Sequence, residues 1–254
     1  MVEFGSRLWA VAHTHAERHM AEETSIQVHF GRPMPLFALD TPVLLPQQVA
    51  PLHIFEPRYI QMIEHALDSA GQIAVGVFHG AGWKQQYHGR PAVRPAVCVG
   101  QIVHHQKLDE GRYNIALHGV CRASIISEVP PAEGRLYREV MLEPVGLEEP
   151  DPSALADVRG RLETMLSHGP LEHLANAQTL VQHLRDEEIP TQILIEVLGF
   201  SMIAAPETRY SLLAEADVNI RAEIVTRELD GLGEVIRKAL HQHPERWPKG
   251  VSWN

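Results

Sequence analysis

Apolar residues recur at one spacing early in the chain and at another later, and the change separates predicted strands from predicted helices. Residues 49–55 form a short apolar run before a proline, which predicts a strand. A helix is predicted to begin at Pro57, because proline fits the first helical turn without losing a hydrogen bond. Gly71 is predicted to end this helix in the left-handed conformation. The apolar stripe of the helix is Tyr59, Met62, Ile63, Ala66 and Leu67.

Four further segments have the composition or the alternation of strands. Residues 81–91 contain glycines and a proline without an apolar period, so a loop is predicted there. Gly100 is predicted to mark a bulge, and residues 108–112 a hairpin loop. Short strands joined by such turns predict a small closed or half-closed β structure. The predicted strand segments are residues 72–80, 93–108 (one bent strand or a pair of strands), 112–127 and 136–145.

Helical spacing dominates after residue 152. The acidic, proline-containing residues 148–152 are predicted to be an exposed connection. In the last helix, Gly231 and Gly233 each cost about 1 kcal/mol relative to alanine, which predicts a bend. The predicted helices are residues 153–168, 175–185, a third from residue 191, 206–215 and 217–240.

These patterns predict an α+β chain in four parts. Residues 1–33 are an N-terminal extension and residues 34–147 a β-rich subdomain. Residues 148–241 are an α-helical bundle subdomain, and residues 242–254 are a C-terminal tail.

One stretch also carries a family resemblance. The sequence PLHIFEPRYIQMIEHAL, within the dense match at residues 36–67, resembles the signature of the Lon protease N-terminal (substrate-binding) domain family. The resemblance continues more weakly through residues 94–125 and 206–229, and it departs at Pro46-Gln47, where relatives often have Pro-Gly. It implies a PUA-like β barrel followed by a helical bundle, and a role in binding substrate polypeptides.

Composition excludes several classes of protein. The chain of 254 residues has a net charge of −10 and no cluster of lysine and arginine, which argues against nucleic-acid binding. It has neither a secretion signal nor an apolar run of the roughly 18–20 residues that a membrane helix needs. Its two cysteines, Cys98 and Cys121, give no disulfide framework and fit a reducing cytoplasm.

The motifs of catalysis are missing from the sequence. Gly80, Gly82 and Lys84 do not have the spacing of a phosphate-binding loop, and no Gly-x-Ser-x-Gly or His-Glu-x-x-His pattern occurs. We therefore expect neither ATPase nor peptidase activity, and no cofactor. His15 and His19 have the spacing of metal ligands on a helix, with His13 nearby, but no cysteine or carboxylate completes a shell. We interpret this segment as a solvated extension without a metal.

The strand–helix junction holds the candidate binding residues. Glu56, Arg58 and Tyr59 either contact a peptide or set the geometry of the junction. Trp83 and Tyr87 in the predicted loop are either binding anchors or a cap over the strands. The peptide-binding candidates are His53, Phe55, Glu56, Arg58, Tyr59, Trp83 and Tyr87.

The sequence favours non-catalytic recognition of polypeptides. The expected partners are unfolded or client polypeptides and an ATP-dependent protease, with the chain as an adaptor in protein quality control. Two alternatives stay open: a hydrolase whose histidines and carboxylates converge only in three dimensions, and an RNA binder suggested by the PUA-like shape alone. The sequence gives no oligomeric state.

Overall fold

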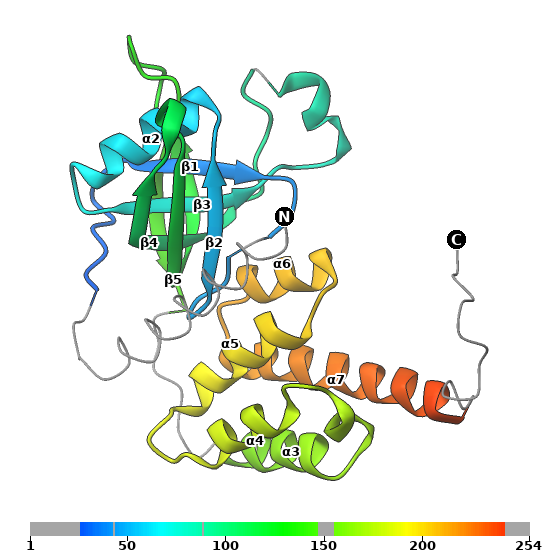
Figure 1. Ribbon diagram of the computed structural model, residues 1–254. Coiled ribbons are helices and arrows are strands. Elements are labelled where there is room, and N and C mark those ends of the chain that lie inside the picture. Colours follow the sequence, from blue (N-terminus) through cyan, green and yellow to red (C-terminus); the bar gives the residue numbers. More distant parts are fainter. Residues whose placement is uncertain (1–25, 43, 88, 147–154, 242–254) are drawn as a thin grey trace. The chain divides into compact units, whose positions relative to one another are not determined.

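The computed structural model describes residues 26–42, 44–87, 89–146 and 155–241. It contains two compact units. The first unit holds the strands with helices α2 and α6, and the second holds α3, α4, α5 and α7 (Figure 1). The fold class is α+β, as predicted.

Six strands form the sheet of the first unit in the order β2-β5-β4-β3-β1-β6, and β5 also pairs with β6. β1 and β3 are parallel, and the other pairs are antiparallel. Within the described part of the chain, every strand except β2 therefore has hydrogen-bonded neighbours on two sides. The likeness to a PUA-like barrel stays a prediction. The strands are β1 (Met34–Leu39), β2 (Val49–Ile54), β3 (Gln72–Val77), β4 (Ala96–Lys107), β5 (Tyr113–Glu128) and β6 (Arg138–Val145).

Strand β5 changes partner near Gly119. Residues 113–118 pair with β2, and residues 122–128 pair with β6. The Gly119 carbonyl accepts a hydrogen bond from the Gln47 N–H, and the Gly119 N–H donates to the Gln48 carbonyl, both at 2.8 Å. A Cβ at Gly119 would lie 2.1 Å from the carbonyl oxygen of Leu45, so only glycine fits this approach. Gln47, where the family resemblance departs, has a φ of +66°.

Helix α2 (Pro57–Leu67) has the predicted stripe. Tyr59, Met62, Ile63 and Ala66 are buried, which confirms four of the five stripe positions, and Leu67 is half-buried. Gly71 has a φ of +70°, and its N–H donates to the Ala66 carbonyl, as the predicted left-handed helix end requires.

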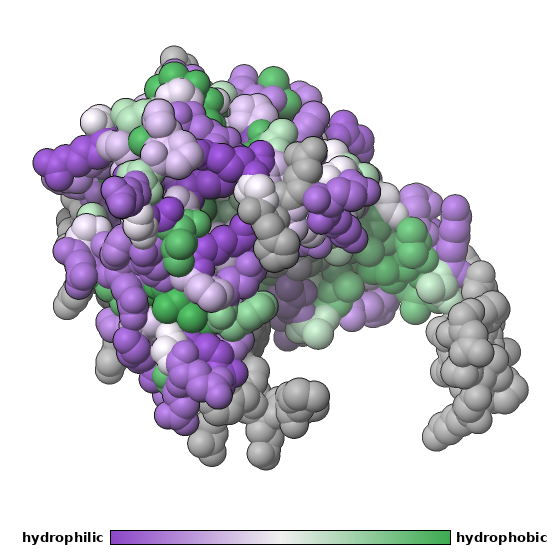
Figure 2. Space-filling model, turned by 90° about the horizontal axis from the view of Figure 1, so that it is seen from above, coloured by the Kyte–Doolittle hydropathy of each residue, from purple (hydrophilic) through white to green (hydrophobic). Residues whose placement is uncertain are grey.

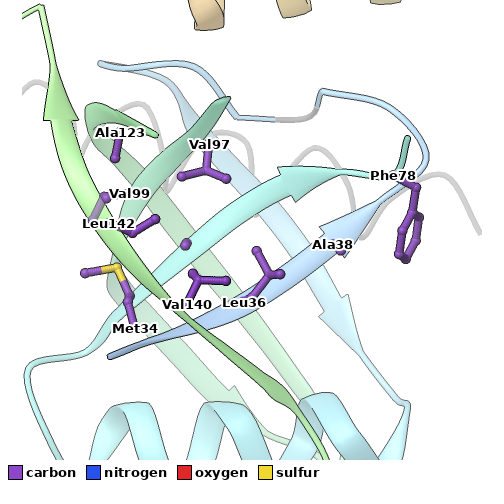
Figure 3. Packing of buried hydrophobic residues seen from close by; sticks show 10 residues of the cluster. Met34, Leu36, Ala38, Phe78, Val97, Val99, Ala123, Val140 and Leu142 are labelled. Atoms are coloured by element: carbon purple, nitrogen blue, oxygen red, sulfur yellow. The ribbon is translucent and has the colours of Figure 1, made fainter. Parts of the chain in front are cut away.

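The strands contribute to a cluster of buried apolar residues. Labelled side chains from β1, β4 and β6, such as Leu36, Val99 and Val140, lie close together in this cluster (Figure 3). Polar residues dominate the face seen from above, where the nearer hydrophobic patches are small and separate (Figure 2). The core cluster comprises Met34, Leu36, Ala38, Ala74, Phe78, Val97, Val99, Ala123, Val140 and Leu142.

Several local predictions can be compared with the structure. Residues 93–108 contain one strand, β4, whose register with β5 shifts between Val99 and Gly100, but the extra residue at this shift is Val120 of β5 and not the predicted Gly100. The hairpin loop contains a short 3₁₀ turn at Asp109–Gly111. The prediction of an irregular loop at residues 81–91 is wrong for Ala81–Gln86, which form a 3₁₀ helix. Helices of this kind are short, so no apolar periodicity in the sequence predicts them.

Helix α6 (Pro206–Ala214) packs against β4 and β5 in the first unit. The Ala96 N–H donates to the Tyr210 hydroxyl at 3.0 Å, and the Arg94 guanidinium lies 3.3 Å from the centre of the Tyr210 ring. Arg122 Nε donates to the Leu212 carbonyl at 3.0 Å. The sequence-based division grouped this helix with the helical subdomain.

The second unit is a small helical group. Its apolar stripes meet in a core, and a buried ion pair joins Arg221 to Glu196 at 3.1 Å. α7 continues through Gly231 and Gly233 as one helix. The predicted connection at residues 148–152, the extension at residues 1–25 and the tail at residues 242–254 lie outside the described residues. The helices are α3 (Ala156–Ser167), α4 (Ala177–Arg185), α5 (Thr191–Met202) and α7 (Val218–His241).

Candidate functional site

The junction between β2 and α2 is held by an arginine between two tyrosine rings. The Arg58 guanidinium lies 4.5 Å from the Tyr59 ring centre and 4.4 Å from the Tyr87 ring centre. Its Nε donates to Glu56 Oε2 at 3.1 Å. Burial lowers the pKa of Arg58, but Tyr59, Glu56 and Tyr87 together outweigh it and raise that pKa. The charge of Arg58 is therefore balanced within the junction itself.

Tyr87 connects the 81–91 segment to the junction. Its hydroxyl donates to Glu56 Oε1 at 2.5 Å, and Arg58 Nη1 donates to the Tyr87 carbonyl at 3.2 Å. Burial and the hydrogen bond to Glu56 raise the pKa of the Tyr87 hydroxyl. The hydroxyl thus stays protonated and keeps donating to the carboxylate at neutral pH.

The aromatic residues of this segment cover the core. Trp83 stacks on Phe78 with ring centres 4.8 Å apart, and Tyr87 lies 5.7 Å from Trp83. Both Trp83 and Tyr87 are partly buried against the core cluster of the strands. This placement matches the cap that the sequence offered as one interpretation.

Tyr59 has the position of a structural residue. Its hydroxyl donates to the Ala38 carbonyl at 3.2 Å, and its ring meets Phe37 edge-on with centres 4.5 Å apart. Burial raises the pKa of Tyr59 to about 12. Tyr59 therefore joins the start of α2 to β1.

A cavity of about 640 Å³ lies beside this junction, and we call it the junction pocket. Its apolar walls come from β1, from the start of α2 and from two loops, residues 89–91 and 129–137. The apolar lining residues are Leu36, Ala38, Pro57, Tyr59, Phe78, Pro91, Val129, Pro130, Pro131, Leu136 and Tyr137. The charged lining residues are Glu56, Arg58, Arg90, Arg135, Arg138 and Glu139.

Polar side chains of α2 fix one loop of the pocket. Gln61 Nε2 donates to the Gly134 carbonyl, and Gln61 Oε1 accepts from the Leu136 N–H, both at 2.8 Å. His65 Nδ1 lies 2.9 Å from the Tyr137 hydroxyl. The exposed face of α2 therefore positions the wall that carries Leu136.

Ion pairs connect the two loops. Glu128 pairs with Arg90 at 3.0 Å and also with Arg138, whose Nη1 donates to the Pro91 carbonyl at 2.7 Å. Burial raises the pKa of Glu128, but Arg138 and Arg90 outweigh that effect and lower it. Arg135 pairs with Glu139 on the same wall.

The predicted candidates fall into three groups. Glu56, Arg58 and Tyr59 line the junction pocket. Trp83 and Tyr87 contact residues that line it: Trp83 stacks on Phe78, and the Tyr87 hydroxyl donates to Glu56. His53 and Phe55 are exposed outside the pocket, where their rings stack with centres 6.0 Å apart and His53 Nδ1 meets Asn114 Oδ1 at 2.8 Å.

Sequence reasoning missed the loop residues of the pocket. Arg90, Arg135, Leu136 and Arg138 were not candidates, although all four line it. The run RLYRE after Pro130-Pro131 combines two arginines with an exposed leucine and a tyrosine, and this composition was the available signal.

Comparison with known proteins gives the family. The model of the ATP-dependent protease La (LON) substrate-binding domain matches residues 33–231. The chain belongs to this Lon substrate-binding domain family. The resemblance found in the sequence is thereby confirmed. A search of curated proteins gave no match.

Solved structures of Lon N-terminal domains have the same fold. The N-terminal domain of a Mycobacterium avium complex Lon protease has a TM-score of 0.59 and 16% identity, over 78% of this chain and 98% of that chain. A Lon N-terminal domain protein from Xanthomonas campestris has a TM-score of 0.51 and 20% identity, over 76% of this chain and 95% of that one. Both likenesses concern the fold.

Other chemistry finds little support in the described part of this Lon-family chain. Within that part, no group of three or more histidine, cysteine, aspartate or glutamate side chains could hold a metal ion. His13, His15 and His19 lie outside it. Cys98 is buried, and burial raises the pKa of the Cys121 thiol to about 11, so it is not an activated nucleophile. Among the helices of the described ranges, none has the length and apolar character to span a bilayer.

Proposed function

We propose that this chain is a non-catalytic polypeptide-binding module, and that a bound polypeptide inserts an apolar side chain into the junction pocket. One observation carries the proposal: residues of the family-like segment, from Leu36 to Tyr59, line a single cavity of about 640 Å³. Ligand sites usually measure about 300–1,000 Å³ and have mainly apolar walls with a few polar groups. The junction pocket has both properties.

The composition of the pocket supports binding without catalysis. The described residues that line it include no serine, threonine, cysteine, histidine or lysine. Of the two lining carboxylates, Glu56 is engaged by Arg58 and Tyr87, and Glu139 pairs with Arg135. Such a site offers apolar contact and fixed charges, but no nucleophile with a neighbouring base.

The pocket is a better site than the open edge of the sheet. β2 pairs only with β5 within the described residues, so its other edge resembles a place for strand addition. Pro51, opposite Ala116, lies in the middle of this strand. Proline has no N–H to donate, and it interrupts this edge.

The proposal also names the ligands, a partner protein and a cellular compartment. Unfolded or client polypeptides would be the ligands, and an ATP-dependent protease would be the partner of an adaptor that works in the cytoplasm. Burial of one apolar side chain contributes about 1.5–3 kcal/mol before the costs of association. We therefore expect weak binding at one pocket, as suits a module that meets many sequences.

The test compares two exposed apolar residues of the first unit. Leu136, 58% exposed, lines the pocket, whereas Ile126 on β5, 60% exposed, does not. Fluorescence anisotropy with labelled casein as the unfolded ligand would measure binding to the full chain and to Leu136→Asp and Ile126→Asp. We expect Leu136→Asp to weaken binding about tenfold, or about 1.4 kcal/mol, and Ile126→Asp to match the parent.

Two outcomes would contradict the proposal. If both variants lose the same affinity for casein, the binding site is not the junction pocket. If the parent chain does not bind casein, the proposed function is wrong. A circular dichroism melt of each variant serves as the folding control, since exposed substitutions of this kind usually change stability by less than 0.5 kcal/mol.

A further inference from the structure

The junction pocket has more positive than negative charge, although the chain as a whole has a net charge of −10. Four arginines and two glutamates line it. We propose that the pocket selects polypeptide segments in which a carboxylate accompanies the apolar side chain. This inference rests on the proposed function and names the class of ligand.

The internal carboxylates do not occupy all the guanidinium groups. Glu128 pairs with both Arg90 and Arg138, so among the described residues the carboxylates paired with the four lining arginines are Glu56, Glu128 and Glu139. Each guanidinium has five N–H donors in a planar fork. Donors are therefore in excess of carboxylate acceptors around the pocket.

Two of the arginines keep free donors. Arg90 makes both of its hydrogen bonds through Nη2, to Glu128 at 3.0 Å and to the Val129 carbonyl at 3.1 Å. Arg135 is held through Nη1 by Glu139. Within the described residues, Nε and Nη1 of Arg90, and Nε and Nη2 of Arg135, have no hydrogen-bond partner, and none of these atoms is a buried unsatisfied group. They are available to an incoming acceptor.

The other two arginines serve the structure of the pocket. Arg58 lies between two tyrosine rings and pairs with Glu56, and Arg138 spans Glu128 and the Pro91 carbonyl. We therefore assign carboxylate recognition to Arg90 and Arg135, which come from the two different loops of the pocket. Guanidinium and carboxylate groups match in geometry. An arginine that is already paired through one edge can therefore still donate from its other edge to a ligand carboxylate.

The apolar walls specify the rest of the ligand. Pro130, Pro131 and Leu136 are exposed on the same loop as Arg135. A segment with an apolar side chain next to an aspartate, a glutamate or a free C-terminal carboxylate satisfies both features. The acidic chain repels acidic peptides in general, so a preference for them would have to arise locally at this pocket.

The first experiment uses the unmodified chain and a matched set of fluorescein-labelled peptides. All have the same apolar–aromatic centre, flanked by glutamate, glutamine or lysine, and each is made with a free or an amidated C-terminus. Anisotropy is measured at about 50 mM and about 500 mM salt. We expect the glutamate-flanked or free-acid peptide to bind about tenfold tighter than the neutral amide, with the difference shrinking at high salt.

The second experiment changes the two arginines. Arg90→Gln and Arg135→Gln should each reduce the preference for carboxylate peptides and leave the affinity for the neutral amide unchanged. Arg112→Gln is the matched control, because Arg112 lies in the β4–β5 hairpin and does not line the pocket, and its guanidinium pairs with Glu110 and donates to the Asp109 carbonyl. Arg135→Glu should shift the preference toward the lysine-flanked peptide.

The outcomes separate this inference from the proposed function. If neutral, acidic and basic peptides bind the parent chain equally and Leu136→Asp weakens all of them, the function stands and carboxylate selection is wrong. If no peptide binds, the proposed function itself fails. A preference that survives in both Arg90→Gln and Arg135→Gln, or that Arg112→Gln removes equally, also overturns the assignment. The parent-chain measurements decide the question even if a variant does not fold.

Discussion

Replacing Tyr87 by phenylalanine tests whether the 81–91 segment is part of the strand–helix junction. The change removes the hydroxyl that donates to Glu56 Oε1 at 2.5 Å. The ring stays, and with it the contacts to Phe78 and Trp83. Glu56 also keeps its ion pair with Arg58. The substitution therefore removes the hydroxyl's hydrogen bond to Glu56 together with its interaction with Arg58, and leaves the ring contacts in place.

The expected loss follows from the charge and the burial of the acceptor. A hydrogen bond to a charged group contributes about 1.5–3 kcal/mol. The Glu56 side chain is 25% exposed, so water replaces part of what is lost, and we expect about 1–2 kcal/mol. The pair should be coupled: in a double-mutant cycle with Glu56→Gln, the interaction energy should reach about 1 kcal/mol.

Trp83 provides the assay. Urea unfolding followed by tryptophan fluorescence reports on the first unit if Trp9, Trp247 and Trp253 are first replaced by phenylalanine, since Trp83 stacks on Phe78 there. Tyr137→Phe is the control for an exposed tyrosine hydroxyl, which bonds His65, and it should cost less than about 0.5 kcal/mol. Additivity of Tyr87→Phe and Glu56→Gln within about 0.3 kcal/mol would refute the reasoning.

Three further predictions concern stability. Met62→Ala should cost about 2–5 kcal/mol in urea unfolding because Met62 is fully buried, and a loss below 1 kcal/mol would contradict the packing of α2. Gly119→Ala should prevent native folding, because its Cβ would lie 2.1 Å from the Leu45 carbonyl oxygen, and soluble expression checks this. Gly231→Ala, on the open face of α7, should instead stabilise the chain by up to about 1 kcal/mol, which a melting temperature would show. The pKa of Tyr59 is raised from about 10 to about 12, so the folded state retains a proton that the unfolded state loses. This stabilisation, about 2–3 kcal/mol, is present below pH 10 and is lost as the pH rises to 12. Tyr59→Phe should flatten that loss, and an unchanged stability–pH curve would count against the burial of its hydroxyl.

The strand–helix unit was predictable because neighbours in the sequence determine it. The proline at the start of α2, the stripe and Gly71 are all local signals, and each has the expected outcome in the structure. The place of α6 was not predictable in this way. Its apolar face required a partner, but the partners are Ala96, Arg94 and Arg122, roughly a hundred residues away in the chain. No short-range pattern carries that information.

Only the junction side of the pocket could be predicted from the sequence, because its other side also depends on contacts between residues far apart in the chain. Gln61 and His65 occupy the polar face of α2, and residues on such a face usually contact solvent. Here they hold the loop with Leu136 and Tyr137. A sequence pattern shows that these side chains are polar, but it does not show that a later loop returns to meet them.

The structural interpretation of the junction residues does not conflict with the proposed function. Glu56 and Arg58 pair with each other and bind Tyr87, so they line the pocket but offer little charge to a ligand. The free donors belong instead to Arg90 and Arg135, on loops outside the densest part of the family-like segment. The wall at the strand–helix junction therefore depends on the junction contacts, whereas the unpaired donors belong to the loops. It follows that substitutions of Arg90 and Arg135 should alter which polypeptides bind, and substitutions in the junction should alter whether the pocket forms at all.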